Sequence, residues 1–240
     1  MLSFVKIYHM LKEIIDNFYL DRQKNKKEQT SFWISEAGKC PRQIFFKFKN
    51  VKGKDLEANI LRLFDHGEHM HQLIMKPLIS TSNRNIHVVA SEIDIPAGEL
   101  VRGRADAIIS DGKDLYVLDV KSMNSMIFEK LATPKEENID QIQLYLYYFK
   151  IPRGILLYVD KDRLKLKEFI INLDEERVKN ILDNLTILKT KIDNNSVPVR
   201  IQTYPDNWQC KYCQFREICD MGEQNEMKWE DFKTKIEATR

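Results

Sequence analysis

The stretch VRGRADAIISDGKDLYVLDVKS, Val101 to Ser122, contains two apolar runs rich in β-branched residues and separated by a polar turn. The pair Asp111-Gly112 is favourable in a tight turn, so GRADAII and LYVLDVKS are predicted to form two strands of a β-hairpin. Side chains alternate along a strand, so Asp119 and Lys121 are expected on one face of the second strand. Because burying an unpaired charge is costly, both groups need partners.

A second carboxylate lies within reach of this pair. Asp106 stands on the first strand, and the short hairpin can bring it beside Asp119. Two close carboxylates repel, and a divalent cation is the usual way of keeping both ionised. A lysine beside such a metal can orient or deprotonate water and stabilise charge on a phosphate. The alternative is a surface pair of Asp119 and Lys121 with Asp106 exposed, since such short motifs recur by chance.

The segments around the hairpin predict one mixed α/β core. Helical spacing of apolar residues predicts a helix over Ala58–Met75, with Pro77 beyond it as a stop signal. HVVASEIDIP predicts a strand before the hairpin, Asn138–Lys150 a helix after it, and GILLYV with LKLKEFIIN a second hairpin. Asp174 can cap a long helix that follows. The predicted fold class is α/β, with a mixed central sheet flanked by helices.

Composition limits the function classes. The 240 residues include 38 basic and 36 acidic ones, a net charge of +2, so any nucleic-acid surface must be a local patch. The sequence contains no run of about 18 apolar residues, so no membrane-spanning helix is expected. The first residues form an amphipathic pattern and not a signal peptide. An intracellular, cytoplasmic protein without a membrane partner is therefore expected. Three regions are predicted: a helix and charged linker (1–30), a main domain (31–220) and a tail (221–240).

Three of the four cysteines form a compact pattern, Cys210-x2-Cys213-x5-Cys219, and Cys40 lies far upstream. Disulfides are not expected without a secretory signal. Four thiolates could hold a structural zinc or a four-iron cluster, and spacing does not decide between them. Four unrelated free thiols are the alternative, which the clustering of three in one segment disfavours.

Together, GRADAII and YVLDVKS resemble the catalytic core of the PD-(D/E)xK nuclease superfamily. Ala105 stands where that name has proline, and Asp119 stands where Glu is frequent. One cysteine before the core and three after it resemble the RecB-like iron-sulfur branch, which includes AddB nuclease domains and the CRISPR-associated Cas-four exonucleases. SEAGKCPRQIFF and CKYCQFREIC resemble the flanking motifs of that branch. The similarity extends from about Trp33 to Cys219.

The resemblance implies a catalytic core of the restriction-endonuclease type closed by an iron-sulfur-clamped helical region. It implies Mg²⁺ or Mn²⁺ at the active site and one [4Fe-4S] cluster, with zinc as the alternative to the cluster. The implied metal ligands are His71, Asp106, Asp119 and the Val120 carbonyl, and the implied catalytic residues are Lys121, Asp119, Asp106 and Gln141. The implied cluster ligands are Cys40, Cys210, Cys213 and Cys219.

Further positions carry weaker expectations. Gly67, one turn before His71, would let another backbone approach closely, and His66 and His69 are expected to face solvent. Tyr145, in a Gln-x3-Tyr pattern with Gln141, is expected near the substrate strand. Arg42 and Arg104 are candidate phosphate contacts. Glu92 is either an outer metal ligand or an ordinary surface glutamate.

The function that the resemblance implies is metal-dependent hydrolysis of DNA. The expected enzyme is a single-stranded DNA exonuclease, acting 5′-to-3′, in DNA processing, CRISPR spacer acquisition or recombination and repair. An alternative is a DNA-binding, end-processing subunit with little activity alone, working with CRISPR integration proteins or a helicase. A third reading is a zinc-stabilised binding module without catalysis. Both cellular and viral origins are compatible with the sequence.

Overall fold

The centre of the protein is a mixed five-stranded sheet in the order β2-β4-β5-β6-β7. The computed structural model describes residues 2–23, 28–80, 85–96 and 98–239, with the backbone alone for 2–9. The strands of the sheet are β2 (His87–Asp94), β4 (Arg104–Ser110), β5 (Leu115–Met123), β6 (Arg153–Asp160) and β7 (Leu166–Asn172). Only the β5–β6 pair is parallel; the other three pairs are antiparallel. This arrangement confirms the predicted fold class.

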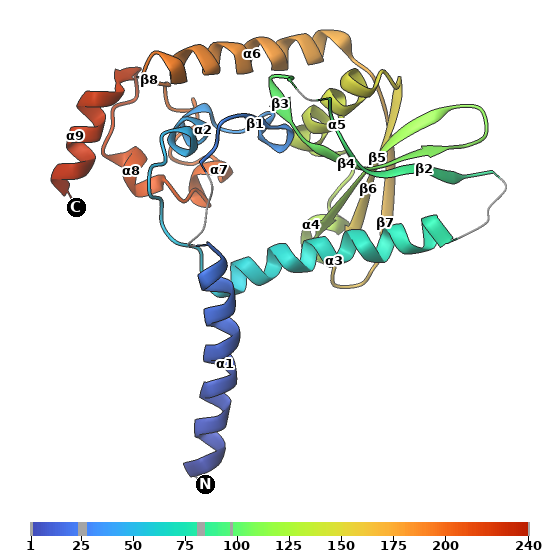
Figure 1. The fold of residues 1–240 in the computed structure, drawn as a ribbon, viewed down its shortest axis with the longest axis horizontal. Helices are drawn as coiled ribbons and strands as arrows, with labels where there is room; N and C mark the ends of the chain where they lie inside the picture. The colour runs from blue at the N-terminus through green and yellow to red at the C-terminus, as the bar shows by residue number, and fades with distance from the viewer. Residues whose placement is uncertain (1, 24–27, 81–84, 97, 240) are drawn as a thin grey trace.

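Helices cover both faces of the sheet (Figure 1). On one face, α3 (Ala58–Ser80) packs through Met75 against Leu118 and Val120 of β5. On the other face, α5 (Glu136–Phe149) packs against Val117, and α6 (Glu175–Asp193) forms an outer layer beyond α5. Because a parallel pair needs a crossover, the chain leaves β5 and passes through α4 (Ser125–Glu129) and α5 before it enters β6. Strand β5 therefore lies between two helical layers.

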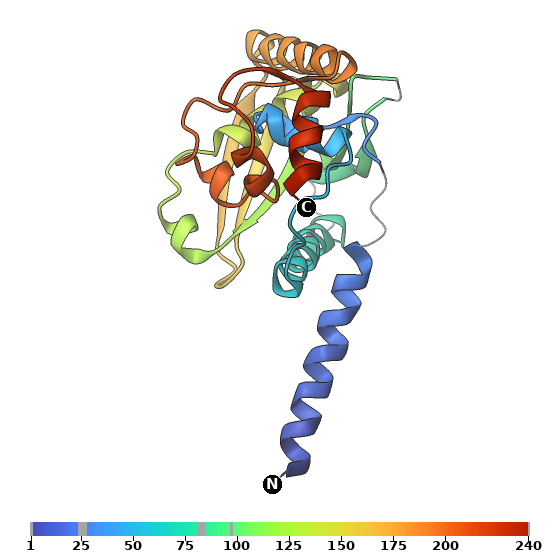
Figure 2. The same cartoon turned by 90° about the vertical axis from the view of Figure 1, so that its left-hand side faces the viewer.

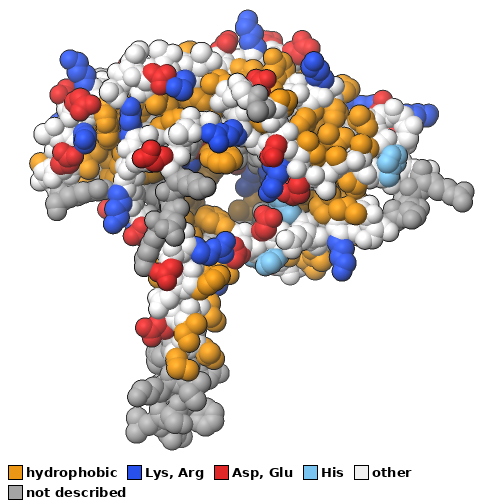
Figure 3. Space-filling view, viewed as in Figure 1, with side chains coloured by type: hydrophobic (Ala, Val, Ile, Leu, Met, Phe, Trp, Pro, Cys, Tyr) orange, Lys and Arg blue, Asp and Glu red, His pale blue; other side chains and the backbone are white. Residues whose placement is uncertain are grey.

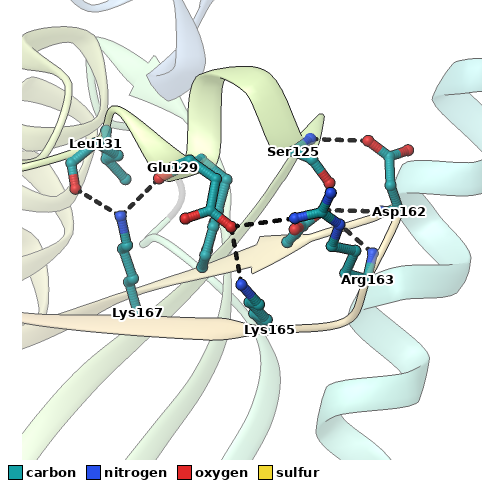
Figure 4. A network of polar contacts seen from close by, with 9 residues as sticks. Ser125, Glu129, Leu131, Asp162, Arg163, Lys165 and Lys167 are labelled. Carbon is teal, nitrogen blue, oxygen red and sulfur yellow. Dashed lines mark hydrogen bonds and ion pairs between the residues drawn. The ribbon is translucent and has the colours of Figure 1, made fainter.

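A polar network fixes α4 to the hairpin of β6 and β7 (Figure 4). Lys167 donates hydrogen bonds to the carbonyl oxygens of Phe128 and Leu131, at 2.6 and 3.0 Å. Glu129 accepts a hydrogen bond from Lys165 at 2.8 Å and pairs with Arg163 at 3.5 Å. The end of β5 is thereby held in place just beyond Lys121.

Segments from the first and last parts of the chain, with the short strand β3 from its middle, pack together beside the sheet. This region contains β1 (Phe32–Trp33), the 3-10 helix η1 (Ile34–Glu36), α2 (Pro41–Phe48), β3 (Val101–Arg102), β8 (Ser196–Val197), α7 (Trp208–Lys211), α8 (Arg216–Asp220), β9 (Met227–Lys228) and α9 (Trp229–Thr239). Trp229, Phe232 and Ile236 of α9 are buried in the main core. These side chains pack around Phe45 and Phe46, so the helix in the predicted tail (221–240) lies against the main domain.

The N-terminal helix α1 (Leu2–Gln23) projects away from the domain in both views (Figures 1 and 2). It is tied to α3 by the ion pairs Arg62–Asp16 and Arg22–Asp65, at 2.5 and 3.1 Å. Residues 24–27 of the predicted charged linker lie outside the described residues. No helix in the described ranges is long and apolar enough to cross a membrane.

Helix α3 continues past the predicted stop signal, because Pro77 lies inside it and the helix ends at Ser80. Proline removes one backbone donor and crowds the preceding turn, which normally breaks or kinks a helix. Here α3 is held against the sheet on both sides of the proline, since Met75 and Leu78 belong to the same apolar cluster. Packing therefore outweighs the local preference.

Candidate active site

The candidate site lies where the sheet opens between β4 and β5. The paired register of these strands runs from Ser110–Leu115 to Ala107–Leu118 and ends there. Beyond that point the Asp106 side chain takes the place of a backbone partner, because its Oδ2 accepts the Val120 N–H at 2.7 Å. The N–H and C=O of one strand residue point the same way, so the Val120 carbonyl also faces this opening.

His71 reaches the opening from α3. Its Nδ1 lies 3.1 Å from Oδ1 of Asp106, so the two oxygens of Asp106 join α3 to β5. The hydrogen bond to Asp106 raises the pKa of His71, and burial opposes this effect. Gly67 faces Ser122, but a Cβ there would lie 3.7 Å from its Oγ, an ordinary contact distance. The expectation that this position requires glycine for a close approach is therefore wrong.

Asp119 and Lys121 meet on the α5 side of the opening. The Nζ of Lys121 donates to Oδ1 of Asp119 and to Oε1 of Gln141, each at 3.0 Å. Asp119 is 2% exposed, and burial raises the pKa of its carboxyl group against the opposing effect of the Lys121 charge. Its Oδ2 lies 2.8 Å from the same Nζ, yet it accepts no hydrogen bond of good geometry.

These groups fit a divalent cation as donors. Mg²⁺ and Mn²⁺ prefer oxygen ligands, and Mn²⁺ also accepts imidazole nitrogen. The opening offers both types: the Oδ2 of Asp119, which accepts no hydrogen bond, the Asp106 carboxylate, the His71 imidazole and the Val120 carbonyl. Among the described residues, no three His, Cys, Asp or Glu side chains already stand at coordinating geometry. These side chains would therefore have to shift toward one another to bind an ion. Figure 3 shows charged and histidine side chains of this face gathered at a hollow beside α3.

Comparison with known proteins agrees with this geometry. The sequence model of the PD-(D/E)XK nuclease superfamily matches residues 36–220, more than half of the chain. The chain belongs to the PD-(D/E)XK nuclease superfamily. The match spans every residue of the opening, from His71 on α3 to Gln141 on α5.

Two known proteins are similar to the chain over most of its length. It is 28% identical over 200 residues to the CRISPR-associated exonuclease Cas4 of Saccharolobus solfataricus, covering 80% of this chain and 89% of that protein. The crystal structure of SSO0001 superposes with a TM-score of 0.55 at 24% identity, covering 87% of this chain and 96% of the other. The first similarity agrees with the expected Cas-four type, and the second shows a shared fold.

Two of the expected substrate contacts are wrong for this superfamily member. Tyr145 is 2% exposed, and its hydroxyl donates to the Arg104 carbonyl at 2.7 Å, so it supports β4 from behind. Arg42 is 1% exposed, and its guanidinium donates to the carbonyl oxygens of Pro198, Glu223 and Asn225. Neither side chain can reach a DNA strand, because burial leaves no surface for one.

Arg104 and Glu92 lie on the surface near the opening. Arg104 remains accessible, and its Nε lies 2.7 Å from Oε2 of Glu92, with both side chains at least half exposed. Glu92 thus faces Arg104 and not the carboxylates. This placement favours the surface reading of Glu92 over an outer metal ligand and leaves Arg104 available to a phosphate.

The four cysteines line one pocket together with Arg42, Arg200 and Tyr204. Burial raises the pKa of Cys213 to about 11, and the charges of the other three cysteines add to this. The Nη1 of Arg42 lies 3.8 Å from Sγ of Cys219. The four cysteines thus share one pocket beside a buried cation, although no three of them in the described structure already stand at metal-holding geometry. Thiolates are the ligand type that suits an iron-sulfur cluster or zinc.

Lys39 is a neighbour of the site that the sequence did not single out. Burial lowers the pKa of Lys39, while Glu137 opposes this effect and the charges of Lys135 and Lys121 strengthen it. The only available signal was its place beside Cys40 in a matched motif. Nothing in its spacing indicated that it would lie within electrostatic range of Lys121.

Proposed function

We propose that the protein is a metal-dependent deoxyribonuclease that degrades single-stranded DNA from an end, in the 5′-to-3′ direction. The observation that carries this proposal is the buried Asp119, which holds Lys121 and keeps one oxygen without a hydrogen bond beside Asp106. Superfamily membership and similarity to a Cas4 exonuclease support hydrolysis of a phosphodiester bond. A role in CRISPR-associated DNA processing is part of this proposal, since that relative is named for it.

Each residue of the opening has a proposed role in the hydrolysis of DNA. Asp106, Asp119, His71 and the Val120 carbonyl would hold Mg²⁺ or Mn²⁺, which supplies positive charge to the phosphate and lowers the pKa of bound water. Lys121 orients the attacking water and stabilises the developing negative charge, because its ammonium group is fixed by two acceptors. Gln141 holds Lys121 from α5 and keeps it directed at the opening.

The four cysteines are proposed to hold one [4Fe-4S] cluster that joins the N-terminal and C-terminal parts of the domain. Cys40 begins α2, whereas the other three lie after residue 209, so a shared cluster would tie segments about 170 residues apart. Iron and acid-labile sulfide measured on anaerobically purified protein test this assignment. A colourless protein with stoichiometric zinc would replace the cluster by the zinc alternative.

A substrate series tests the proposed function. Metal-free protein should leave DNA intact, and Mn²⁺ or Mg²⁺ should restore degradation of a linear single strand. A strand labelled at its 3′ end should shorten stepwise from its 5′ end, whereas 5′-blocked and circular strands should persist. Cleavage of circular strands at the same rate would contradict an end-dependent enzyme. Activity that requires an added protein partner would support an end-processing subunit.

A further inference from the structure

Two large aromatic side chains protrude from the cysteine-bearing segment. Trp208 begins α7 and is 50% exposed, and Tyr212 follows its last residue and is 84% exposed. Tyr212 follows Trp208 by four residues, and both exposed rings flank the same short helix. Cys210, between them, is buried and lines the cysteine pocket. The segment thus directs sulfur inward and aromatic rings outward.

Lys39 joins this surface to the catalytic site. Its Nζ lies 5.1 Å from the centre of the Trp208 ring. The loop that carries it is fastened to α7 by Gln209, whose Oε1 accepts the Cys40 N–H at 2.8 Å and whose Nε2 donates to the Gly38 carbonyl at 3.3 Å. The position of Lys39 relative to Trp208 is therefore set by contacts to the backbone.

Positive charge continues from this surface toward the scissile position. The loop that carries Lys39 packs against the first turns of α5, because a Cβ at Gly38 would lie 2.6 Å from Oδ2 of Asp140. Asp140 directly precedes Gln141, which accepts the hydrogen bond of Lys121. Ammonium groups that lie near one another are stabilised by an anion placed between them. A phosphate next to the one that Lys121 contacts would meet this need.

We propose that Trp208, Tyr212 and Lys39 form a binding site for the unpaired nucleotides that adjoin the scissile bond. The rings would stack on bases and the ammonium group of Lys39 would pair with a phosphate. Aromatic rings interleaved with basic groups bind single strands with little sequence preference, because every base has a stacking face. A duplex hides those faces, so the site would select unpaired strands. The inference rests on the proposed function, which makes a DNA strand the substrate.

Binding without cleavage tests the site. Anisotropy of a labelled oligothymidylate is measured with iron-loaded protein in EDTA. Trp208→Ala is expected to weaken binding about 5- to 100-fold, the range for loss of one stacked base. Tyr212→Ala and Lys39→Ala should weaken it as well. Trp33→Ala is the matched control, because Trp33 is 51% exposed on β1, and it should stay within about twofold.

Tryptophan fluorescence reports stacking directly. Oligothymidylate should quench the wild type and Trp33→Phe, whereas Trp208→Phe should lose most of the quenching. Equal binding by wild type and Trp208→Ala, or quenching that disappears only in Trp33→Phe, would overturn the site. Iron content measured on each variant identifies any that has lost its fold. Cleavage by Lys121→Ala is assayed in parallel, and wild-type activity of that variant would contradict the proposed function. If only the Trp208 variants behave like the wild type, the binding site is wrong but the proposed function is not contradicted.

Discussion

Asp119 is the residue whose surroundings most clearly demand a ligand. A carboxylate that is 2% exposed normally accepts several hydrogen bonds, yet its Oδ2 accepts none of good geometry. Lys121 compensates for its charge, and the nearby Asp106 adds repulsion. The sequence alone predicted that these three residues act together, because strand alternation and a tight turn define their positions.

Asp160, at the end of β6, is a second buried carboxylate whose Oδ2 accepts no hydrogen bond, but three donors compensate its other oxygen. It is fully buried, and its Oδ1 accepts hydrogen bonds from the Ser125 hydroxyl and from the backbone N–H groups of Asp162 and Arg163. Desolvation alone would raise its pKa, but these hydrogen bonds outweigh it and leave the pKa lowered. The stabilisation is thus present above the unfolded-state value of about 3.9 and is lost as pH falls through the folded-state value.

The Asp160→Asn variant tests this assignment. Its melting temperature should fall less steeply than that of the wild type on acidification from about pH 5 to 3, because the variant has no carboxylate to protonate. Asp183→Asn, on the exposed side of α6, is the control. Parallel curves for wild type and Asp160→Asn would contradict the role of these hydrogen bonds.

The sequence did not predict which of the motif residues are exposed to solvent. Tyr145 and Arg42 match positions of a nucleic-acid enzyme, but both are buried, Tyr145 behind β4 and Arg42 beside the cysteine pocket. Residue type and spacing carry no information on which side of a helix faces the core when both sides are apolar, as on α5. Lys39 was overlooked for the converse reason, since its partners come from separate parts of the chain.

At the level of elements, two glycines have opposite roles. A Cβ at Gly103, between β3 and β4, would lie 2.3 Å from Cγ2 of Ile34. At Gly67, within α3, the nearest atom would be 3.7 Å away. Close packing of η1 against the strand thus requires glycine only at position 103, and this contact holds β4 in line for Asp106.

Alanine substitutions should separate the two glycines. Gly67→Ala should raise the free energy of unfolding by about 0.5–1 kcal/mol, because alanine favours a helix interior. Gly103→Ala should lower it by about 1–3 kcal/mol through overpacking. Denaturant titration of both variants measures these changes. A loss of stability in Gly67→Ala would mean that α3 approaches β5 more closely than described.

Helix α3 also shows the limit of local rules. The pattern predicted the helix, and the structure confirms it. Pro77 was expected to lie beyond the end, but packing of the last turn against the sheet extends the helix to Ser80. Boundaries of elements depend on such tertiary contacts, which a sequence window does not contain.

At the scale of the whole molecule, Arg42 joins the two ends of the domain. From α2 it binds carbonyl oxygens of Pro198, Glu223 and Asn225, all in the C-terminal part. The sequence predicted closure of the chain by cysteines but not by this arginine. The sequence analysis also placed residues 221–240 outside the main domain, because the sequence of a short amphipathic segment does not show which surface it packs against.

Removal of the Arg42 side chain should weaken the packing between α2 and the C-terminal part of the domain. Arg42→Ala removes a buried guanidinium that donates to three carbonyl oxygens, and the expected loss is at least about 3 kcal/mol of unfolding free energy. Arg104→Ala is the control, since its exposed ion pair with Glu92 is worth about 0–1 kcal/mol. Thermal melting of both variants measures these effects. Equal stability of the two variants would contradict the structural role of Arg42.

The most direct test of the active site is the cleavage rate of a labelled single strand by Lys121→Ala at saturating Mn²⁺. The account predicts a rate at least about 100-fold below wild type, because the group that orients water and stabilises charge is gone. Asp119→Asn should be similarly impaired, and Lys179→Ala, exposed on α6, should match the wild type. Degradation by folded Lys121→Ala at the wild-type rate would contradict the assignment of this site.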